Sequence, residues 1–128
     1  MSWQIVGIPN DIDGEAAQDQ SGYSVSLSSD GSIVAIGSKL NDGNGEDSGH
    51  VRIFRNIKGK WEQIGNDIDG EASGDYSGSS ISLSSDGSIV LHQYIMMDLM
   101  RMVGKPTQMD MCVFLKTSMI VGFKLAMI

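Results

Sequence analysis

Residues 10–34 have the sequence NDIDGEAAQDQSGYSVSLSSDGSIV, and residues 66–90 have the sequence NDIDGEASGDYSGSSISLSSDGSIV. When Asn10 is aligned with Asn66, 20 of these 25 positions are identical without a gap. Trp3 and Trp61 extend the correspondence upstream. Repeated units of this kind bury their apolar faces against their neighbours. The sequence therefore predicts a first unit over about 3–60 and a second unit that starts at 61 and is truncated near 90.

Within each unit the periodicity is that of β-strands. Tyr23, Val25 and Leu27 alternate with serines, which gives one apolar face. Asp30-Gly31 follows as a tight turn, and residues 33–36 are apolar on both faces, as in a strand that is buried on both sides. About four short strands per unit and no helix are expected in residues 1–90. The predicted fold class is all-β, with antiparallel four-stranded units forming a fragment of a β-propeller of about one and a half blades.

Several segments carry a resemblance to a known family. SGYSVSL at 21–27, Asp30-Gly31, VAIGS at 34–38 and GHVRIF at 49–54 resemble the FG-GAP repeats of integrin-type β-propellers. The chain also resembles the W-x-Q-x-G-x-D-I-x-G-E-A repeats of long, uncharacterised proteins of algae and marine microbes. The resemblance implies an extracellular or cell-surface protein that acts in adhesion or as a binding scaffold.

Residues 91–128 have a different composition. They contain eight of the nine Met, and they carry four basic and two acidic residues, whereas residues 1–90 carry five basic and fourteen acidic residues. Read one base out of frame, Met97-Asp98 and Met109-Asp110 must each encode Gly. With permitted codons elsewhere, the end of the tail becomes GHVRVFKNINDSWVQIGND, which aligns with 49–67. We therefore hypothesise that this Met-rich tail is a frameshifted repeat. The alternative is an amphipathic helix with Leu91, Ile95, Leu99 and Met102 on its apolar stripe.

Charge and composition exclude some classes of function. The net charge is −7, which argues against nucleic-acid partners and anionic membranes. No apolar run reaches the roughly 18 residues that span a bilayer, so no membrane insertion is expected, and no signal peptide precedes Trp3. The single cysteine, Cys112, excludes an intramolecular disulfide.

The acidic loops are the candidate metal sites, because Ca²⁺ prefers oxygen ligands. The two loops repeat the same carboxylates, namely Asp11, Asp13 and Glu15 in the first unit and Asp67, Asp69 and Glu71 in the second. The integrin-type family places its calcium loop between the first two strands, where this chain has only Asp30. We favour the alternative that these loops are polar turns whose Asp side chains bond their own backbone. The loop Asn41–Ser48 is a second candidate for weak calcium binding, and we favour the alternative that it is a solvated loop between strands.

The remaining candidates favour a structural role. SGYSVS lacks the G-x-S-x-G spacing of a nucleophile elbow, and His50 is interpreted as a cross-strand packing residue. Trp3 and Trp61 are expected in the core between blades rather than stacked on sugars. The sequence thus predicts a chain that is not an enzyme, has no cofactor unless calcium binds, and acts as a repeat scaffold for an unidentified protein or glycan. Its neighbouring repeats are needed for stability. The alternatives are an accessory fragment of a secreted hydrolase or lyase and the product of a degenerate gene copy.

Overall fold

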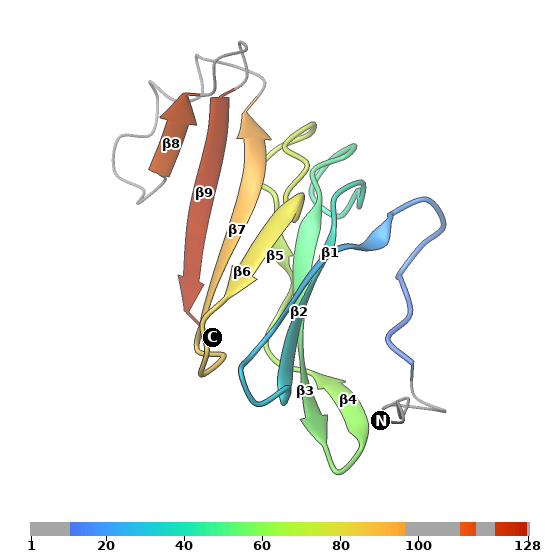
Figure 1. Cartoon of the computed structure of the whole chain (residues 1–128). Helices are drawn as coiled ribbons and strands as arrows, with labels where there is room; N and C mark the ends of the chain where they lie inside the picture. Colours follow the sequence, from blue (N-terminus) through green and yellow to red (C-terminus); the bar gives the residue numbers. More distant parts are fainter. Residues whose placement is uncertain (1–10, 97–110, 115–119, 128) are drawn as a thin grey trace.

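The computed structural model describes residues 11–96, 111–114 and 120–127, and in these residues the fold is all-β (Figure 1). The first sheet contains β1 (Ser21–Leu27), β2 (Ile33–Ser38), β3 (His50–Ile57), β4 (Lys60–Gln63) and β5 (Ile68–Asp69). The second contains β6 (Ser80–Leu83), β7 (Ile89–Met96), β8 (Met111–Phe114) and β9 (Ile120–Met127). All named pairings are antiparallel. The predicted fold class is confirmed.

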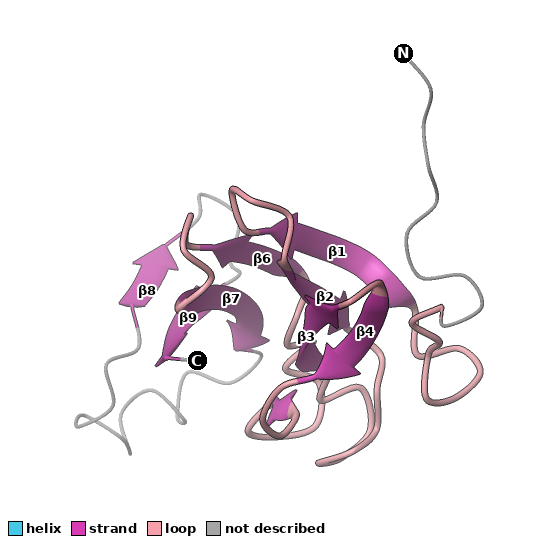
Figure 2. Ribbon diagram, turned by 90° about the horizontal axis from the view of Figure 1, so that it is seen from below, coloured by secondary structure: helices cyan, strands magenta, loops and turns pink. Residues whose placement is uncertain are grey.

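The strand orders show how far the two sheets correspond. The first sheet has the order β1-β2-β3-β4 with β5 beside β3, and the second has the order β6-β7-β9-β8. The sequence repeat relates β1 to β6 and β2 to β7. β1 and β2 form a hairpin in the first unit, and β6 and β7 form the corresponding hairpin in the second. The two sheets pack against each other, and β6 lies next to the hairpin of β1 and β2 (Figures 1 and 2).

The hairpin between β1 and β2 is closed by one carboxylate. Oδ1 of Asp30 accepts hydrogen bonds from the hydroxyls of Ser28 and Ser32 and from the backbone N–H of Ser32. Gly31 takes a φ of 72°, which glycine adopts without strain. The same bonds recur around Asp86 in the second unit. The turn predicted at Asp30-Gly31 is therefore present in both units.

The main core lies between the two sheets. It contains the buried side chains of Ile33, Ala35, Val51 and Ile53 from the first sheet and Val90 from β7, with Ile64, Ile68, Ile81 and Leu83 packed against it. The other face of β2 carries a second cluster in which Val34, Ile36 and Phe54 are buried, and Ile12 and Trp61 pack against them. β2 is thus buried on both faces, as its continuous apolar sequence predicts. Trp61 is half-buried and packs on a cluster of the first sheet, so its predicted position between blades stays a prediction, and Trp3 lies outside the described residues.

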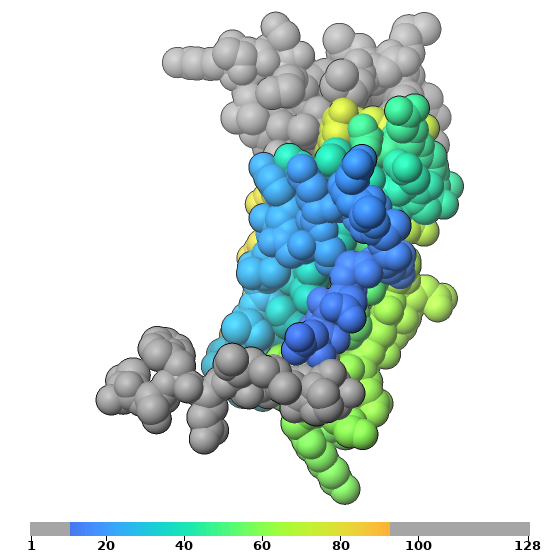
Figure 3. Space-filling model, turned by 90° about the vertical axis from the view of Figure 1, so that its right-hand side faces the viewer, coloured from blue at the N-terminus to red at the C-terminus, as the bar shows by residue number. Residues whose placement is uncertain are grey.

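The two faces of β1 lie in the opposite surroundings to those that their composition predicts, because the apolar face is exposed and the serine face is covered. The apolar side chains of Tyr23, Val25 and Leu27 are 55%, 61% and 57% exposed. The serines face the second unit instead. The hydroxyl of Ser24 donates to the carbonyl of Gly78 at 2.6 Å, and Ser26 Oγ accepts the backbone N–H of Leu83 at 3.0 Å. β1 and the loop before it form the blue middle part of the surface in Figure 3, beside the green surface of later residues.

The start of the Met-rich tail is a strand. β7 continues beyond Val90 to Met96 and pairs with β9 over its whole length. The helix considered for this segment is therefore wrong over residues 91–96, because the tail sequence extends the β-ladder instead. Leu99 and Met102 lie outside the described residues. The frameshift hypothesis concerns the gene and stays a prediction.

The serine contacts give a first prediction. Replacing Ser24 or Ser26 by Ala should lower the free energy of unfolding by about 1 kcal/mol, because each removes a hydrogen bond between the units. The matched controls are Ser80→Ala and Ser82→Ala, which occupy the same repeat positions but are exposed on β6. Urea denaturation measures the difference. Equal effects at all four positions would contradict the assigned packing.

The hairpin turns give a second prediction. The N–H of Ser32, followed by its hydroxyl, lowers the pKa of Asp30 from 3.8 to about 2. A carboxyl whose pKa is lower in the folded chain stabilises the fold above its unfolded pKa, so this contribution is lost as the pH falls from about 4 through 2. Ser32→Ala should raise the pKa of Asp30 toward 3.8. Carbon-detected NMR titration measures the pKa of Asp30, and the pKa of Asp86, whose turn keeps its serines in this variant, is the internal control. Because the variant keeps the backbone N–H, an unshifted Asp30 midpoint would refute the contribution of the Ser32 hydroxyl.

Candidate functional site

The two ends of the sheets differ in their connections. Short hairpins join β1 to β2, β3 to β4 and β6 to β7 at one end, while the long loops 11–20, 39–49 and 70–79 lie at the other end (Figure 1). We call the second end the loop end. Loop 39–49 belongs to the first unit and loop 70–79 to the second. Residues distant in sequence therefore meet there.

Hydrogen bonds join these three loops into one structure. Asn41 is buried and donates from Nδ2 to Oδ2 of buried Asp19 at 2.8 Å. The backbone N–H groups of Gly74 and Tyr76 donate to the carbonyls of Glu46 and Asp47 at 2.9 and 3.1 Å. A Cβ at Gly49 would collide with the backbone of Ser77, so only glycine permits this approach. The loops are thus held by backbone and side-chain contacts within and between the units.

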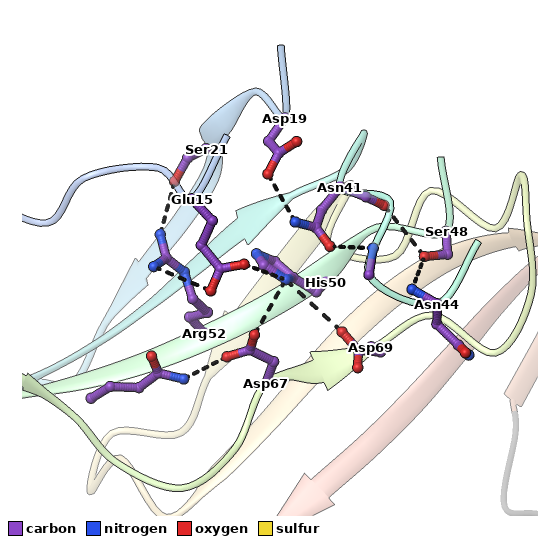
Figure 4. Close-up of polar contacts among 12 residues, drawn as sticks. Glu15, Asp19, Ser21, Asn41, Asn44, Ser48, His50, Arg52, Asp67 and Asp69 are labelled. Atoms are coloured by element: carbon purple, nitrogen blue, oxygen red, sulfur yellow. Dashed lines mark hydrogen bonds and ion pairs between the residues drawn. The ribbon is translucent and has the colours of Figure 1, made fainter. Parts of the chain in front are cut away.

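His50, the first residue of β3, lies beneath these loops with its side chain 1% exposed (Figure 4). Three carboxylates surround its Nδ1 atom. The distances are 4.0 Å to Oε2 of Glu15, 3.7 Å to Oδ2 of Asp67 and 3.9 Å to Oδ1 of Asp69. Glu15 comes from the first unit, whereas Asp67 and Asp69 come from the second. Asp69 is also the direct register partner of His50 in the pairing of β3 with β5.

Neighbouring side chains hold two of these carboxylates. Gln63 donates from Nε2 to Oδ1 of Asp67 at 2.5 Å, which leaves Oδ2 directed at His50. Arg52 Nη1 lies 3.9 Å from Oε1 of Glu15, which leaves Oε2 directed at His50. Arg52 itself is anchored by donating from Nη2 to the carbonyl of Asp13 at 2.7 Å. Each of the two carboxylates thus uses one oxygen for a protein partner and turns the other to the imidazole.

The structure brings together half of the carboxylates that the sequence singled out as calcium ligands. Glu15, Asp67 and Asp69 meet at His50, while the side chains of Asp11 and Asp13 are exposed and belong to no described cluster. The backbone N–H of Glu71 donates to Oδ2 of Asp75 at 3.1 Å, within its own loop. His50 was not predicted as a partner of these groups. The repeated acidic loops were a signal, but nothing local links them to the start of β3.

Other polar side chains at the loop end accept hydrogen bonds from the backbone of their own loops. Asp75 Oδ2 accepts the backbone N–H of Ala72 at 2.9 Å, in addition to that of Glu71. In the loop Asn41–Ser48, Oδ1 of Asp42 accepts the N–H of Asp47 at 2.8 Å, and Oδ1 of Asn41 accepts that of Gly43. These side chains replace backbone partners that the irregular loop does not supply. They shape the loop end.

A serine and a histidine also meet in the second unit. Ser77 Oγ lies 3.0 Å from Nδ1 of His92. A serine and a histidine at this distance have the residue types and spacing of a catalytic nucleophile and its general base. Both side chains are buried, with exposures of 0% and 1%. A substrate cannot reach this hydroxyl, so the contact acts as packing between β7 and the loop before β6.

The fold and the loops define a class of protein, namely a β-repeat protein whose antiparallel sheets stack like the blades of a propeller. In comparison with known families, residues 11–54 match the FG-GAP repeat. The chain therefore contains an FG-GAP-like repeat, as the sequence resemblance implied. No curated protein and no solved structure matches the chain. In the described residues, no helix is long and apolar enough to cross a membrane.

Proposed function

We propose that the chain is a non-catalytic repeat scaffold that binds a protein or glycan through its loop end. The observation that carries this proposal is the joining of loops 11–20, 39–49 and 70–79 by hydrogen bonds across two units. Binding residues are commonly placed on loops that a rigid scaffold positions. The sheets supply such a scaffold here. The tight hairpins at the opposite end offer far less irregular backbone.

The FG-GAP match supports an adhesion or binding role and an extracellular or cell-surface location, because such repeats are typical of extracellular proteins. The finer likeness to the W-x-Q-x-G-x-D-I-x-G-E-A repeats belongs to the same proposal. The loop end exposes Asp42, Asn44 and Glu46. Carboxylates and amides of this kind suit a basic protein surface or a hydroxyl-rich glycan, and they disfavour nucleic acid.

Neighbouring repeats are part of the proposed scaffold. Ile81 and Leu83 of the second unit pack on the core formed by Ile33 and Val51 of the first. The equivalent residues of the first unit, Val25 and Leu27, are exposed on β1. Another unit that packs on this face would bury them in the same way. The accessory-hydrolase and degenerate-gene alternatives remain predictions that no described feature specifically favours.

The loop-end proposal is tested by presenting the purified chain to an array of glycans and extracellular proteins. For a ligand that binds, Glu46→Lys should weaken affinity at least about tenfold, since a charge reversal in the binding surface disrupts complementarity. Glu62→Lys on β4, which is also exposed but lies at the hairpin end, is the matched control. Equal losses in both variants, or cleavage of the ligand, would overturn the proposal.

The role of neighbouring repeats gives a separate prediction. Leu83→Ala should cost about 2 kcal/mol or more of unfolding free energy, because it leaves a cavity against the core. Leu27→Ala at the equivalent exposed position should cost less than about 0.5 kcal/mol. When a copy of residues 11–66 is fused upstream, the cost at Leu27 should rise to that at Leu83. If it stays small in the fusion, another unit does not cover this face.

A further inference from the structure

We propose that Glu15, His50 and Asp67, together with Asp69, form a binding site for a divalent transition-metal ion of the zinc type. Glu15 and His50 belong to the first sequence unit and the two aspartates to the second, but β3 and β5, which carry His50 and Asp69, are paired within the first sheet. It would hold the His50 imidazole nitrogen and one carboxylate oxygen each from Glu15 and Asp67, with Asp69 beside them. The proposal is independent of what the loop end binds.

The separations between the candidate ligand atoms suit one ion. One atom each from Glu15, His50 and Asp67 lie within 4.8 Å of one another, and the distances from Nδ1 to the three carboxylates are 3.7, 3.9 and 4.0 Å. Zinc binds nitrogen and oxygen at about 2.0–2.2 Å, so two tetrahedral ligands lie roughly 3.4 Å apart. Side-chain shifts that bring the carboxylate oxygens closer to Nδ1 would complete the geometry.

The contacts of His50 provide an independent indication of a ligand. The ring is 1% exposed, and its Nδ1 is directed into the cluster of carboxylates. The carboxylate oxygen nearest to Nδ1 is 3.7 Å away, which is too far for a hydrogen bond. A protonated imidazole paired directly with these carboxylates would approach them to about 2.7–2.9 Å. The wider spacing leaves room for an ion between the ring and the oxygens.

The local charge attracts a cation. Three carboxylates converge, and Arg52 is the one guanidinium that pairs with them in the described residues, at 3.9 Å from Glu15. The negative charge of the cluster therefore exceeds the positive charge of this fixed partner. The carboxylates are also partly exposed, with side-chain exposures of 43%, 29% and 43% for Glu15, Asp67 and Asp69. An ion can thus enter from solvent and reach the buried imidazole.

The groups behind the ligands favour a defined site. Gln63 fixes Asp67, Arg52 orients Glu15, and strand pairing sets Asp69 opposite His50. Such supporting contacts orient metal ligands and raise affinity. The imidazole distinguishes the site from a calcium loop, because Ca²⁺ selects oxygen ligands, whereas zinc and its neighbours accept imidazole. An ion bound only by the folded chain would also stabilise the pairing of β3 with β5.

The test is calorimetric titration of the full chain with ZnCl₂ and, separately, with CaCl₂. We expect one zinc ion to bind, with calcium much weaker. Asp67→Asn with Asp69→Asn should weaken zinc binding at least about tenfold, and His50→Gln should do the same. The matched control is Asp11→Asn with Asp13→Asn, which changes the equivalent exposed positions of the first unit. Circular dichroism of each variant establishes that the sheets are retained.

Each result bears on the site. Selective loss in the second-unit and His50 variants supports it, and so does a zinc-dependent rise in melting temperature that these variants abolish. Absence of zinc binding overturns it. Equal binding in the Asp67 and Asp11 double variants overturns it too, because the ion would then sit elsewhere. Binding of calcium in preference to zinc would overturn the transition-metal assignment. The titration uses the chain without any other ligand, so its outcome does not depend on whether the loop end binds a protein or glycan.

Discussion

The contact between the two repeat units is the constraint on which the rest of the structure depends. Ala35 and Val51 of the first sheet are fully buried in a core that Val90, Ile81 and Leu83 of the second unit complete. Burial of apolar surface is the main favourable term in folding. A single unit would leave this face in water. The serine hydrogen bonds from β1 to the second unit then fix how the sheets are aligned.

The same contact builds the loop end. Once the sheets are stacked, loop 39–49 of one unit and loop 70–79 of the next approach closely enough for backbone hydrogen bonds, and glycine at position 49 permits that approach. Asp67 and Asp69 reach the start of β3 in another way, because β5 pairs with β3 inside the first sheet and sets Asp69 opposite His50. The loop end is therefore a product of the junction between units, whereas the candidate metal site is built on the first sheet. In a longer array of such units, each junction would offer the same arrangement.

The proposed scaffold and the proposed metal site place different demands on the chain. A binding surface needs exposed, variable side chains on a fixed backbone, and Asp42, Asn44 and Glu46 have that setting. A metal site needs oriented ligands around a buried donor, and His50 with its tethered carboxylates has that setting. The first function can change with loop sequence while the second stabilises the first sheet. The two roles are compatible within one repeat.

The sequence by itself determined the repeat, the strands and the hairpin turns, because these depend on local alternation and on residues such as Asp30-Gly31. It also indicated the double burial of β2 through the run at 33–36. Only the tertiary structure decided which face of β1 is covered, since period-2 alternation does not say where the neighbouring unit lies. It likewise decided that Glu15, His50 and Asp67 meet. These residues lie in three separate segments of the sequence, and their approach follows from the pairing of β3 with β5 and from the contact of Arg52 with loop 11–20, which no local pattern encodes.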